Sequence, residues 1–528
     1  MKEKLESLSV SELLYRAYQL EPEKEVLFDG YTRMTYGELM DQSSLLAASL
    51  QKMGISKGDR IAVCLPNWNE FVVIYFAAAH IGAVIVPFNT RYRMYEVQYN
   101  IRNSRAKLAF LTNEFDGVNH MEQFLEAKEN VTSLKQLITV RYKADQLESY
   151  EQLIKGEEVC SSFNRTAVNP KEDVFTILFK SGSTGSPKGA MLTHANVVMT
   201  AIKTAEQMDC TAEDVFFVSV PVFHVFGMVP SILSAVSVGA RMVLLDEYKP
   251  EKALSLTESE KITVKHGVPT MFILELNHKN FQQYDLSSLR TGIIAAAPCP
   301  VEIVKRIRQE MGCEIMVAYG LSETSPTLTM TSFSDNDVVR AETVGKTLPG
   351  AEVKIVDNNR NEVINGEVGE IACRSFGVMK GYCNMPEQTK AVLDEDGWFY
   401  TGDLGTIDIE GNLRIVGRKK EMVVRGGYNI YPREIEEIFY QHPDVMEAAV
   451  VGLPDTVLGE ISCACIKLKP RSQMDEKDLF QFIRERIADY KVPDKMMILD
   501  EFPMTASGKI KKISLREELI ENLEGELR

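Results

Sequence analysis

The sequence has no Cys-x-x-Cys pair, and only two of its nine cysteines, Cys463 and Cys465, lie close together. Zinc sites and disulfide frameworks need cysteines at paired, regular spacings, so neither is expected. We expect reduced thiols, most of them buried. The first twenty residues also lack a continuous apolar core, because acidic residues stand among the apolar ones, and do not resemble a secretory signal. The cytoplasm is the expected compartment.

An excess of positive charge is also missing. Lys and Arg number 59 against 75 Asp and Glu, a net charge of −16, which would repel a nucleic-acid backbone, so no nucleic-acid partner is expected. Apolar residues make up 45% and charged residues 25%, as in globular proteins. At roughly 100 to 200 residues per domain, 528 residues indicate at least two domains. A homodimer is compatible with this composition.

One uncharged run, Phe71 to Phe88, is long enough to cross a bilayer. His80, Gly82 and Pro87 interrupt it, and β-branched residues follow the glycine. This pattern favours a buried helix that leads into a buried strand, with the membrane span as the weaker alternative. A second uncharged stretch, 215–240, contains Pro221 and Pro230 and is predicted to form a strand, a loop and a helix. No transmembrane segment is therefore expected.

Short β-branched runs alternate with longer segments of helical period, which predicts an α/β fold with mainly parallel sheets. Between about 345 and 417 the sequence changes to strands separated by Asp, Asn and Gly turns, typical of antiparallel sheet. After 418–420 a small α+β unit is predicted, with helices at 432–441 and 476–487 and strands near 447–454 and 461–469. We predict an N-terminal domain over 1–417, a hinge at 418–420 and a C-terminal domain over 421–528.

The segment Leu178 to Thr193 (LFKSGSTGSPKGAMLT) carries the strongest chemical signal. It follows an apolar strand and precedes a helical stretch, so we predict a strand, a loop and then a helix. Its glycines, hydroxyl residues and lysine suit a loop that wraps a polyphosphate with backbone N–H groups. The spacing differs from a Walker A loop, because Lys188 follows Pro187 and precedes Gly189. A mobile Gly/Ser surface loop is the alternative on composition alone.

Further motifs follow in a fixed order. They are PVFHVFG (221–227), AYGLSETSP (318–326), GWFYTGD (397–403), GRKKEMVVRGGYNIYPREIE (417–436) and PMTASGKIKK (503–512). Together with the 178–193 loop, they resemble the signature segments of the adenylate-forming (AMP-binding) superfamily, in its acyl-CoA synthetase branch. The resemblance covers nearly the whole chain. It implies a large N-terminal domain, a mobile C-terminal domain, and ATP, coenzyme A and a carboxylic acid as substrates.

The resemblance also implies a nucleotide site. Lys188 and the 181–185 loop would hold the β- and γ-phosphates, and Glu323 and Thr184 would hold Mg²⁺. Tyr319 would stack on adenine, with Gly320 allowing close approach, and Asp403 would accept hydrogen bonds from ribose. The full set of ATP- and AMP-binding residues is Lys180, Ser181, Gly182, Ser183, Thr184, Gly185, Lys188, Ala297, Tyr319, Gly320, Thr324, Asp403 and Arg418. Taken singly, each residue also has a structural interpretation. Glu323 would cap a helix or lie in solvent, and Tyr319 would belong to the core. Asp403 would cap a turn, and Arg418 would lie on the surface.

The catalytic residues implied by the resemblance are Lys509, Glu323 and His224. Lys509 would reach the α-phosphate and the substrate carboxylate together, Lys420 would be the hinge residue, and Gly426 and Gly427 would line the channel for coenzyme A. Without the family pattern, Lys509 is an ordinary surface lysine, the two glycines form a plain turn, and His224 is a core histidine.

The residues after Phe223 indicate the class of acid. His224 and Val225 stand where amino-acid-activating relatives carry an aspartate, so no buried acid awaits an ammonium group. Phe226, Met228, Ala295 and Ala296 are assigned to an apolar acyl pocket. We therefore predict an ATP-dependent, AMP-forming acyl-CoA synthetase for a medium- or long-chain fatty acid. An aryl-CoA ligase, a stand-alone enzyme that loads a carrier protein, and a non-catalytic acyl- or nucleotide-binding homologue stay open.

Four segments of the chain depart from the family pattern. Lys180 replaces a hydroxyl residue, Ser322 replaces a threonine, 295–297 replaces a glycine-containing run, and Arg425 replaces a small residue. Lys180 either adds a phosphate contact or obstructs one.

Overall fold

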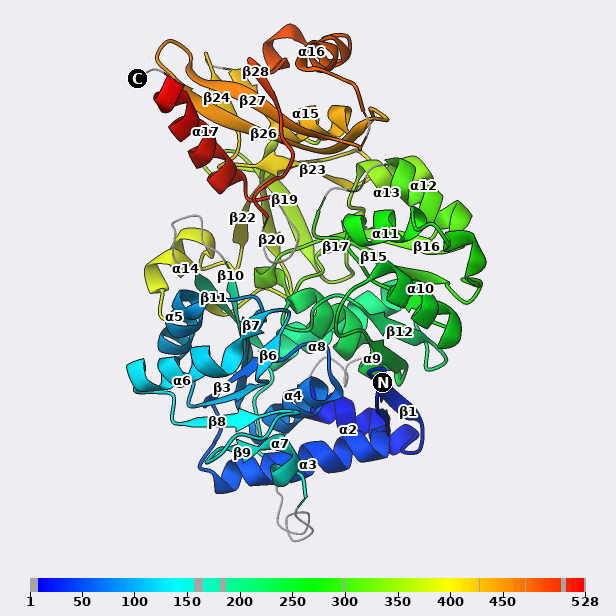
Figure 1. Ribbon diagram of the computed structural model, residues 1–528, viewed down its shortest axis with the longest axis vertical. Helices are drawn as coiled ribbons and strands as arrows, with labels where there is room; N and C mark the ends of the chain where they lie inside the picture. Colours follow the sequence, from blue (N-terminus) through cyan, green and yellow to red (C-terminus); the bar gives the residue numbers. More distant parts are fainter. Residues whose placement is uncertain are drawn as a thin grey trace. The chain divides into compact units, whose positions relative to one another are not determined.

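The computed structural model describes residues 8–155, 165–180, 187–297, 299, 301–426, 428–470, 472–504 and 510–526. The chain forms two compact units. The large unit comprises residues 1–340, 344–352 and 374–399, and the small unit comprises 341–343, 353–373 and 400–528. Figure 1 traces both along the sequence. The predicted mixed α/β class is confirmed. Within the described ranges, no helix combines the length and the apolarity that crossing a bilayer requires.

An eight-stranded sheet in the large unit has the order β21-β11-β10-β4-β3-β5-β8-β9. Its strands from β10 to β9 are parallel to their neighbours, whereas β11 and β21 are antiparallel. The bounds are β3 Arg60–Cys64, β4 Val84–Pro87, β5 Leu108–Leu111, β8 Gln136–Thr139, β9 Glu148–Ser149, β10 Val174–Lys180, β11 Lys188–Thr193 and β21 Gly381–Tyr382.

A nine-stranded sheet forms the other half of the large unit, in the order β18-β17-β16-β15-β14-β12-β13-β1-β2. The strands from β16 to β1 are parallel, so their carboxyl ends share one edge. The bounds are β1 Glu25–Phe28, β2 Arg33–Thr35, β12 Val215–Val218, β13 Arg241–Leu244, β14 Val264–Lys265, β15 Thr291–Ile294, β16 Glu314–Tyr319, β17 Thr329–Met330 and β18 Lys346–Thr347. A separate hairpin joins β6 Glu114–Phe115 to β7 Val118–Asn119.

Helices connect these strands, as the alternating pattern predicts. In Figure 1, α10, α11 and α12 lie beside the green strands of the nine-stranded sheet. The bounds are α2 Val10–Leu20, α3 Tyr36–Lys52, α4 Asn69–Ile81, α5 Met94–Ser104, α6 His120–Asn130, α7 Tyr150–Leu153, α8 His194–Gln207, α9 Ser234–Val238, α10 Pro250–Ser259, α11 Pro269–Leu276, α12 Val301–Glu310, α13 Asp337–Glu342 and α14 Pro386–Val392, with π-helix η2 Gly227–Leu233 and 3₁₀ turns η3 Phe281–Gln283 and η4 Ser322–Thr324.

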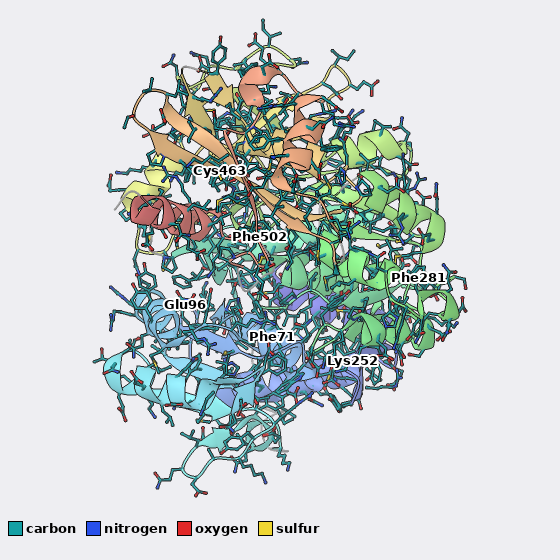
Figure 2. All side chains as sticks on the ribbon, turned by 45° about the horizontal axis from the view of Figure 1, so that its top comes forward. Phe71, Glu96, Lys252, Phe281, Cys463 and Phe502 are labelled. Carbon is teal, nitrogen blue, oxygen red and sulfur yellow. The ribbon has the colours of Figure 1, made fainter. Side chains whose placement is uncertain are left out.

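The uncharged run at Phe71 to Phe88 is a buried helix followed by a buried strand, as predicted. Helix α4 ends at Ile81, Gly82 adopts a left-handed conformation with φ of +68°, and β4 begins at Val84. Phe71, labelled in Figure 2, is 1% exposed. Because every residue of α4 except Glu70 is buried, its apolarity reflects a protein core rather than a lipid contact.

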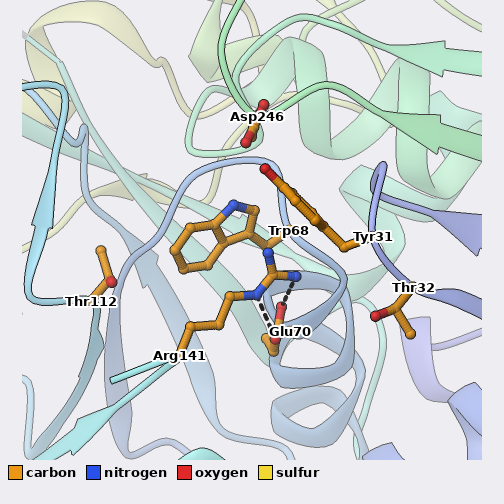
Figure 3. Close-up of a pocket in the computed structure, with 7 residues that line it drawn as sticks. All are labelled: Tyr31, Thr32, Trp68, Glu70, Thr112, Arg141 and Asp246. Atoms are coloured by element: carbon orange, nitrogen blue, oxygen red, sulfur yellow. Dashed lines mark hydrogen bonds and ion pairs between the residues drawn. The ribbon is translucent and has the colours of Figure 1, made fainter. Parts of the chain in front are cut away.

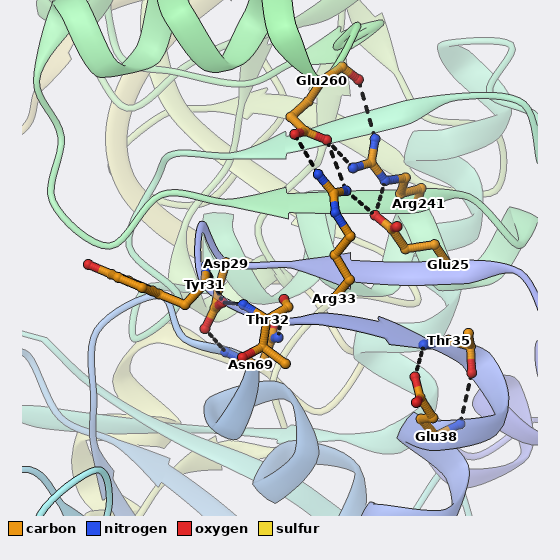
Figure 4. A network of polar contacts seen from close by, with 10 residues as sticks. All are labelled: Glu25, Asp29, Tyr31, Thr32, Arg33, Thr35, Glu38, Asn69, Arg241 and Glu260. Atoms are coloured by element: carbon orange, nitrogen blue, oxygen red, sulfur yellow. Dashed lines mark hydrogen bonds and ion pairs between the residues drawn. The ribbon is translucent and has the colours of Figure 1, made fainter.

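Charged residues fasten the outer strands of the nine-stranded sheet (Figure 4). Arg33 bonds to Glu25 at 2.9 Å and to Glu260 at 2.8 Å. Arg241 of β13 bonds to the same two glutamates. Two guanidinium groups and two carboxylates therefore form a neutral network, which joins β1, β2 and β13 to the residue that follows α10.

The antiparallel region predicted at about 345–417 is a four-stranded sheet of order β19-β20-β22-β23. The bounds are β19 Glu352–Val356, β20 Gly369–Arg374, β22 Phe399–Ile407 and β23 Leu413–Arg418. Strands β22 and β23 pair antiparallel, and Asp403 lies opposite Arg418.

The C-terminal part of the small unit is built around a long hairpin of β26 and β27, with alternate residues buried on both faces. Ala448 and Val450 face a cluster with α15 and α16, and Val451, Cys463 and Phe502 belong to a cluster with α17. Cys463 and Phe502 are labelled in Figure 2. The bounds are β24 Val423–Arg425, β25 Tyr428–Ile430, α15 Pro432–Phe439, β26 Val445–Asp455, β27 Gly459–Leu468, α16 Glu476–Arg484, η5 Asp489–Lys491, β28 Lys495–Ile498 and α17 Lys512–Glu526. The predicted order of helices and strands is confirmed.

Candidate active site

The predicted phosphate-binding segment is a hairpin. Strands β10 and β11 pair antiparallel, and Lys180 lies directly opposite Lys188. The prediction of a strand, a loop and then a helix is wrong in one respect, because strand β11 separates the loop from α8. The loop therefore does not lead directly into a helix N-terminus. Ser181, Gly182, Ser183, Thr184 and Gly185 lie outside the described residues.

Glu323 contacts the base of this hairpin. Its Oε1 atom forms an ion pair with the Lys180 ammonium and accepts a hydrogen bond of 2.6 Å from the Tyr382 hydroxyl. The Lys188 ammonium lies 5.1 Å from the centre of the Tyr382 ring. Three segments far apart in the sequence, β10, η4 and β21, thus meet at one carboxylate. Tyr382 was missed by the sequence analysis, since no local pattern distinguishes it.

Glu323 is a buried charge. Its side chain is 1% exposed, and its Oε2 atom has no hydrogen-bond partner among the described residues. Burial alone would raise the pKa of Glu323, but the Lys180 ammonium and the Tyr382 hydroxyl hold it below its usual value. Burial and the nearby carboxylate raise the pKa of the Tyr382 hydroxyl well above its ordinary range. Glu323 is therefore ionised at neutral pH and has one oxygen left to accept a bond.

The predicted adenine segment follows β16. Gly320 leaves no room for a side chain, because a Cβ atom there would lie 1.3 Å from the Pro326 carbonyl oxygen. Thr324 is fully buried, and its hydroxyl accepts a bond of 2.9 Å from the Leu321 amide and lies 3.1 Å from the Leu321 carbonyl. Thr324 thus stabilises the turn that positions Glu323. Tyr319 is half-buried at the end of β16.

Three predicted motifs share the carboxyl edge of the nine-stranded sheet. Residues 295–297 follow β15, Tyr319 ends β16, and the 221–227 segment follows β12. Ala295 is half-buried, whereas Ala296 and Ala297 are exposed. Ala296 has a φ of +72°, a conformation that favours glycine. Parallel α/β sheets commonly bind ligands at this edge. The assignment of these residues to a site stays a prediction.

The residues assigned to the acyl pocket include two that belong to the core. Phe226 and Met228 are 5% and 0% exposed, and the Phe226 ring stacks on the His266 ring with centroids 5.8 Å apart. His224 is half-buried, and its Nδ1 accepts a bond of 3.3 Å from the Phe226 amide. Phe226 and Met228 are apolar, but the buried Ser231 hydroxyl also lies here and donates to the Phe226 carbonyl at 3.3 Å. Contact of these residues with an acyl chain stays a prediction.

The predicted ribose residues lie in the small unit. Arg418 Nε is 3.0 Å from Asp403 Oδ1 across the β22–β23 pair, and the side chain of Asp403 is 5% exposed while that of Arg418 is 57% exposed. Lys420 is exposed two residues later. Gly426 has a φ of +55°, and its amide donates to the Leu458 carbonyl at 2.9 Å. Gly427 and Lys509 lie outside the described residues.

A polar pocket of about 500 Å³ lies elsewhere in the large unit (Figure 3). It is lined by Tyr31, Thr32, Trp68, Glu70, Thr112, Arg141 and Asp246, none of which was predicted as a site residue. Arg141 lies over the Trp68 ring and is ion-paired with Glu70 at 2.8 Å and with buried Asp29. Arg141 therefore links the residues that follow β1 and β8 to α4, which is a structural role.

The sequence matches the family described as AMP-binding enzyme over residues 14–383 and its C-terminal domain over residues 434–509. YngI of Bacillus subtilis, which carries the provisional name acyl-CoA synthetase, is 40% identical, with 97% of each chain covered. The medium-chain fatty-acid–CoA ligase of Escherichia coli is 35% identical over 95% of this chain and 89% of its own.

Among solved structures, ATP-bound MatB from Rhodopseudomonas palustris superposes with a TM-score of 0.87 at 27% identity, covering 97% of this chain and 99% of MatB. The family match spans most of the chain, and the two relatives above align along nearly all of it. The chain therefore belongs to the AMP-binding enzyme family of adenylate-forming proteins, in the branch of AMP-forming acid–thiol ligases.

Proposed function

We propose that this protein activates an apolar carboxylic acid, a medium- or long-chain fatty acid, as its acyl-AMP and then transfers the acyl group to coenzyme A. The observation that carries the proposal is the convergence of Lys180 and Tyr382 on the buried carboxylate of Glu323, at the base of the predicted phosphate loop. Lys188 lies opposite Lys180 on the same hairpin. Two cations and one buried anion are the charges that binding a metal-complexed polyphosphate requires.

The two half-reactions follow from the substrates. An oxygen of the carboxylate attacks the α-phosphorus of ATP, and the bond to the bridging oxygen of pyrophosphate breaks. The coenzyme A thiolate then attacks the acyl carbonyl and expels AMP. Lys188 would neutralise the departing pyrophosphate, and Lys509 would bind the attacking carboxylate and the α-phosphate. Asp403, paired with Arg418, would accept hydrogen bonds from the ribose hydroxyls.

Magnesium fits the same site. The Oε2 atom of Glu323 is buried and lacks a partner among the described residues, so it can accept a hard cation, with Thr184 as the second protein ligand. A magnesium ion held there would neutralise phosphate charge while pyrophosphate leaves.

The apolar acid is supported by two observations. No acidic side chain follows Phe223, and the buried Phe226 and Met228 make the core at this segment apolar. A relative that aligns along 95% of this chain is named as a medium-chain fatty-acid–CoA ligase. Together these favour a fatty acid over a charged or amino-acid substrate.

The test is ATP–pyrophosphate exchange followed by thioester detection, with acids from acetate to palmitate and with benzoate and cinnamate. We expect exchange and coenzyme A thioesters with straight-chain acids of medium or long length. Lys509→Ala should lower exchange at least about a hundredfold, because it removes a charge from the transition state. Lys261→Ala, which removes a lysine paired with exposed Asp285, is the matched control.

Other outcomes would redirect the proposal. Exchange without a coenzyme A thioester would indicate an enzyme that loads a carrier protein. Products with benzoate and cinnamate alone would indicate an aryl-CoA ligase. Absence of exchange with every acid, in a folded protein that still binds ATP, would contradict the catalytic proposal.

A further inference from the structure

We propose that Lys180 is a tethered cation that performs part of the role of Mg²⁺ at Glu323, so that ATP binds with less dependence on Mg²⁺ than it would with a neutral residue at position 180. This inference rests on the proposed function, because it assumes that the β10–β11 hairpin binds the phosphates of ATP. It concerns Lys180 as a positioning and binding residue, not as a group that takes part in bond breaking.

The Lys180 ammonium lies against the carboxylate of Glu323. It forms an ion pair with Oε1 of Glu323, the carboxylate assigned to the metal. Tyr382 donates to the same oxygen at 2.6 Å, so Oε1 already has two donors and Oε2 is the oxygen left for a metal ion. One of the two carboxylate oxygens, Oε1, is therefore already bonded to the protein's own cation before a metal ion binds.

Burial of Glu323 makes a neighbouring cation necessary. The Glu323 side chain is 1% exposed, and a carboxylate that deep in the protein is stable only with a cation beside it. Without Lys180, that cation would have to come from solvent as a metal ion. With Lys180, the carboxylate already has a cation beside it before any ligand arrives.

Lys180 can contact Glu323 and a phosphate group at the same time. The Lys180 side chain is 32% exposed although its ammonium contacts a carboxylate that is 1% exposed, so the lysine remains partly accessible. An ammonium has three N–H donors, and one of them suffices for Glu323, which leaves two for phosphate oxygens. Because Lys180 ends β10 directly opposite Lys188 at the start of β11, two positive charges flank the loop from both of its strands.

The experiment measures ATP affinity by titration calorimetry in the absence of acid, so that no turnover occurs. ATP is titrated into each protein once in the presence of Mg²⁺ and once in the presence of a chelator. The dissociation constant measured in the chelator, divided by that measured with Mg²⁺, gives the Mg²⁺ dependence of ATP binding. The variants are Lys180→Thr, which introduces a hydroxyl, Lys180→Met, which keeps the length without charge, and Lys180→Arg, which keeps the charge. Lys261→Met is the control for a lysine outside the site.

We expect the ratio to be about tenfold larger in Lys180→Thr and Lys180→Met than in the original protein, the usual worth of one charged hydrogen bond. The increase should come from weaker binding in the chelator. Lys180→Arg and Lys261→Met should keep the original ratio. Equal ratios in all five proteins would overturn the proposal, and would leave Lys180 as a residue that only stabilises Glu323.

Lys180→Met leaves Glu323 buried without its cation, so this variant is checked by its thermal unfolding midpoint. If it fails to fold, Glu323→Gln and the double variant Lys180→Met/Glu323→Gln replace it, since neither contains the unpaired carboxylate. In the chelator, the double variant should bind ATP about tenfold more weakly than Glu323→Gln, because it lacks the lysine. Equal affinities would refute the proposal.

Pyrophosphate exchange by the original protein separates this inference from the proposed function. Exchange together with identical Mg²⁺ dependence in every variant would keep the function and reject the role of Lys180. A protein without exchange, whose Mg²⁺ dependence still rises in Lys180→Thr and Lys180→Met, would reject the function and keep the role of Lys180.

Discussion

At the residue scale, His266 couples the core of the large unit to pH. The ring is fully buried, its Nε2 donates to the Pro230 carbonyl at 3.1 Å, and its Nδ1 accepts from the Ile293 amide at 3.1 Å. Both nitrogens are satisfied only by the neutral ring. Burial lowers the pKa of His266 to about 4, from an ordinary value near 6.5.

Lowering the pH should destabilise the folded protein through His266. Between pH 6.5 and 4 the unfolded chain binds a proton at this histidine and the folded protein does not, so the free energy of unfolding falls as the pH is lowered. From pH 6.5 to 5 the loss of unfolding free energy from this one group should be about 1.6 kcal/mol. Urea unfolding of His266→Gln, whose amide can donate and accept as the ring does, should show a decline smaller by about that amount.

His80 and His194 are also buried, with pKa values lowered to about 3 and about 4, but they titrate equally in both proteins and cancel in the comparison. An identical decline in His266→Gln would contradict the assignment of the proton to this ring.

The sequence singles out candidate residues for the site, but it does not predict their contacts. The motif order singled out Glu323 and Lys188, and the departure at Lys180 was visible as a lysine in place of a hydroxyl residue. Its pairing with Glu323 depends on β10 lying near η4, and the contribution of Tyr382 depends on β21 pairing with β11. Such contacts join residues far apart in the chain, and a single sequence carries no local signal for them.

At the element scale, predictions succeeded where a local breaker marks the boundary. Gly82 separates α4 from β4, and it was visible in the sequence as the glycine inside an apolar run. Strand β11 was missed because a short run of Gly, Ala, Met and Leu after a glycine-rich loop has no clear period. It becomes a strand through pairing with β10 on one side and β21 on the other.

Gly82 gives this boundary a measurable consequence. Its φ is +68°, and a Cβ atom would lie 3.0 Å from Val168 Cγ1 and 3.1 Å from Lys57 Cγ. Gly82→Ala should therefore lower the free energy of unfolding by about 2 to 3 kcal/mol, from backbone strain and crowding together. Gly54→Ala is the matched control, because Gly54 has a φ of +84° with nothing within 4 Å of a Cβ atom.

Gly54→Ala should cost about 1 kcal/mol, the backbone contribution alone. Chemical denaturation of the two variants under one condition measures the difference. Equal losses would show that the neighbours of Gly82 move aside, and that its left-handed backbone conformation accounts for the whole effect.

At the scale of the whole molecule, composition and pattern predicted the architecture. The alternation of strands and helices indicated parallel sheets, and the change to Asp, Asn and Gly turns near residue 345 indicated the antiparallel sheet of β19, β20, β22 and β23. The order of the strands within each sheet could not be predicted, because β1 joins β13 and β21 joins β11 across long stretches of chain. The hinge at 418–420 stays a prediction.

That hinge can be tested by restricting one backbone dihedral. If a single site must serve two half-reactions, the backbone at Lys420 has to change conformation between them. Lys420→Pro fixes φ near −65° and should hold the chain in one state, so one half-reaction persists and the other falls at least about tenfold. Lys420→Ala keeps the dihedral free and should retain both. Pyrophosphate exchange reports the first half-reaction, and transfer from chemically prepared acyl-AMP to coenzyme A reports the second. Equal losses of both in Lys420→Pro, with an unchanged thermal midpoint, would refute Lys420 as the hinge.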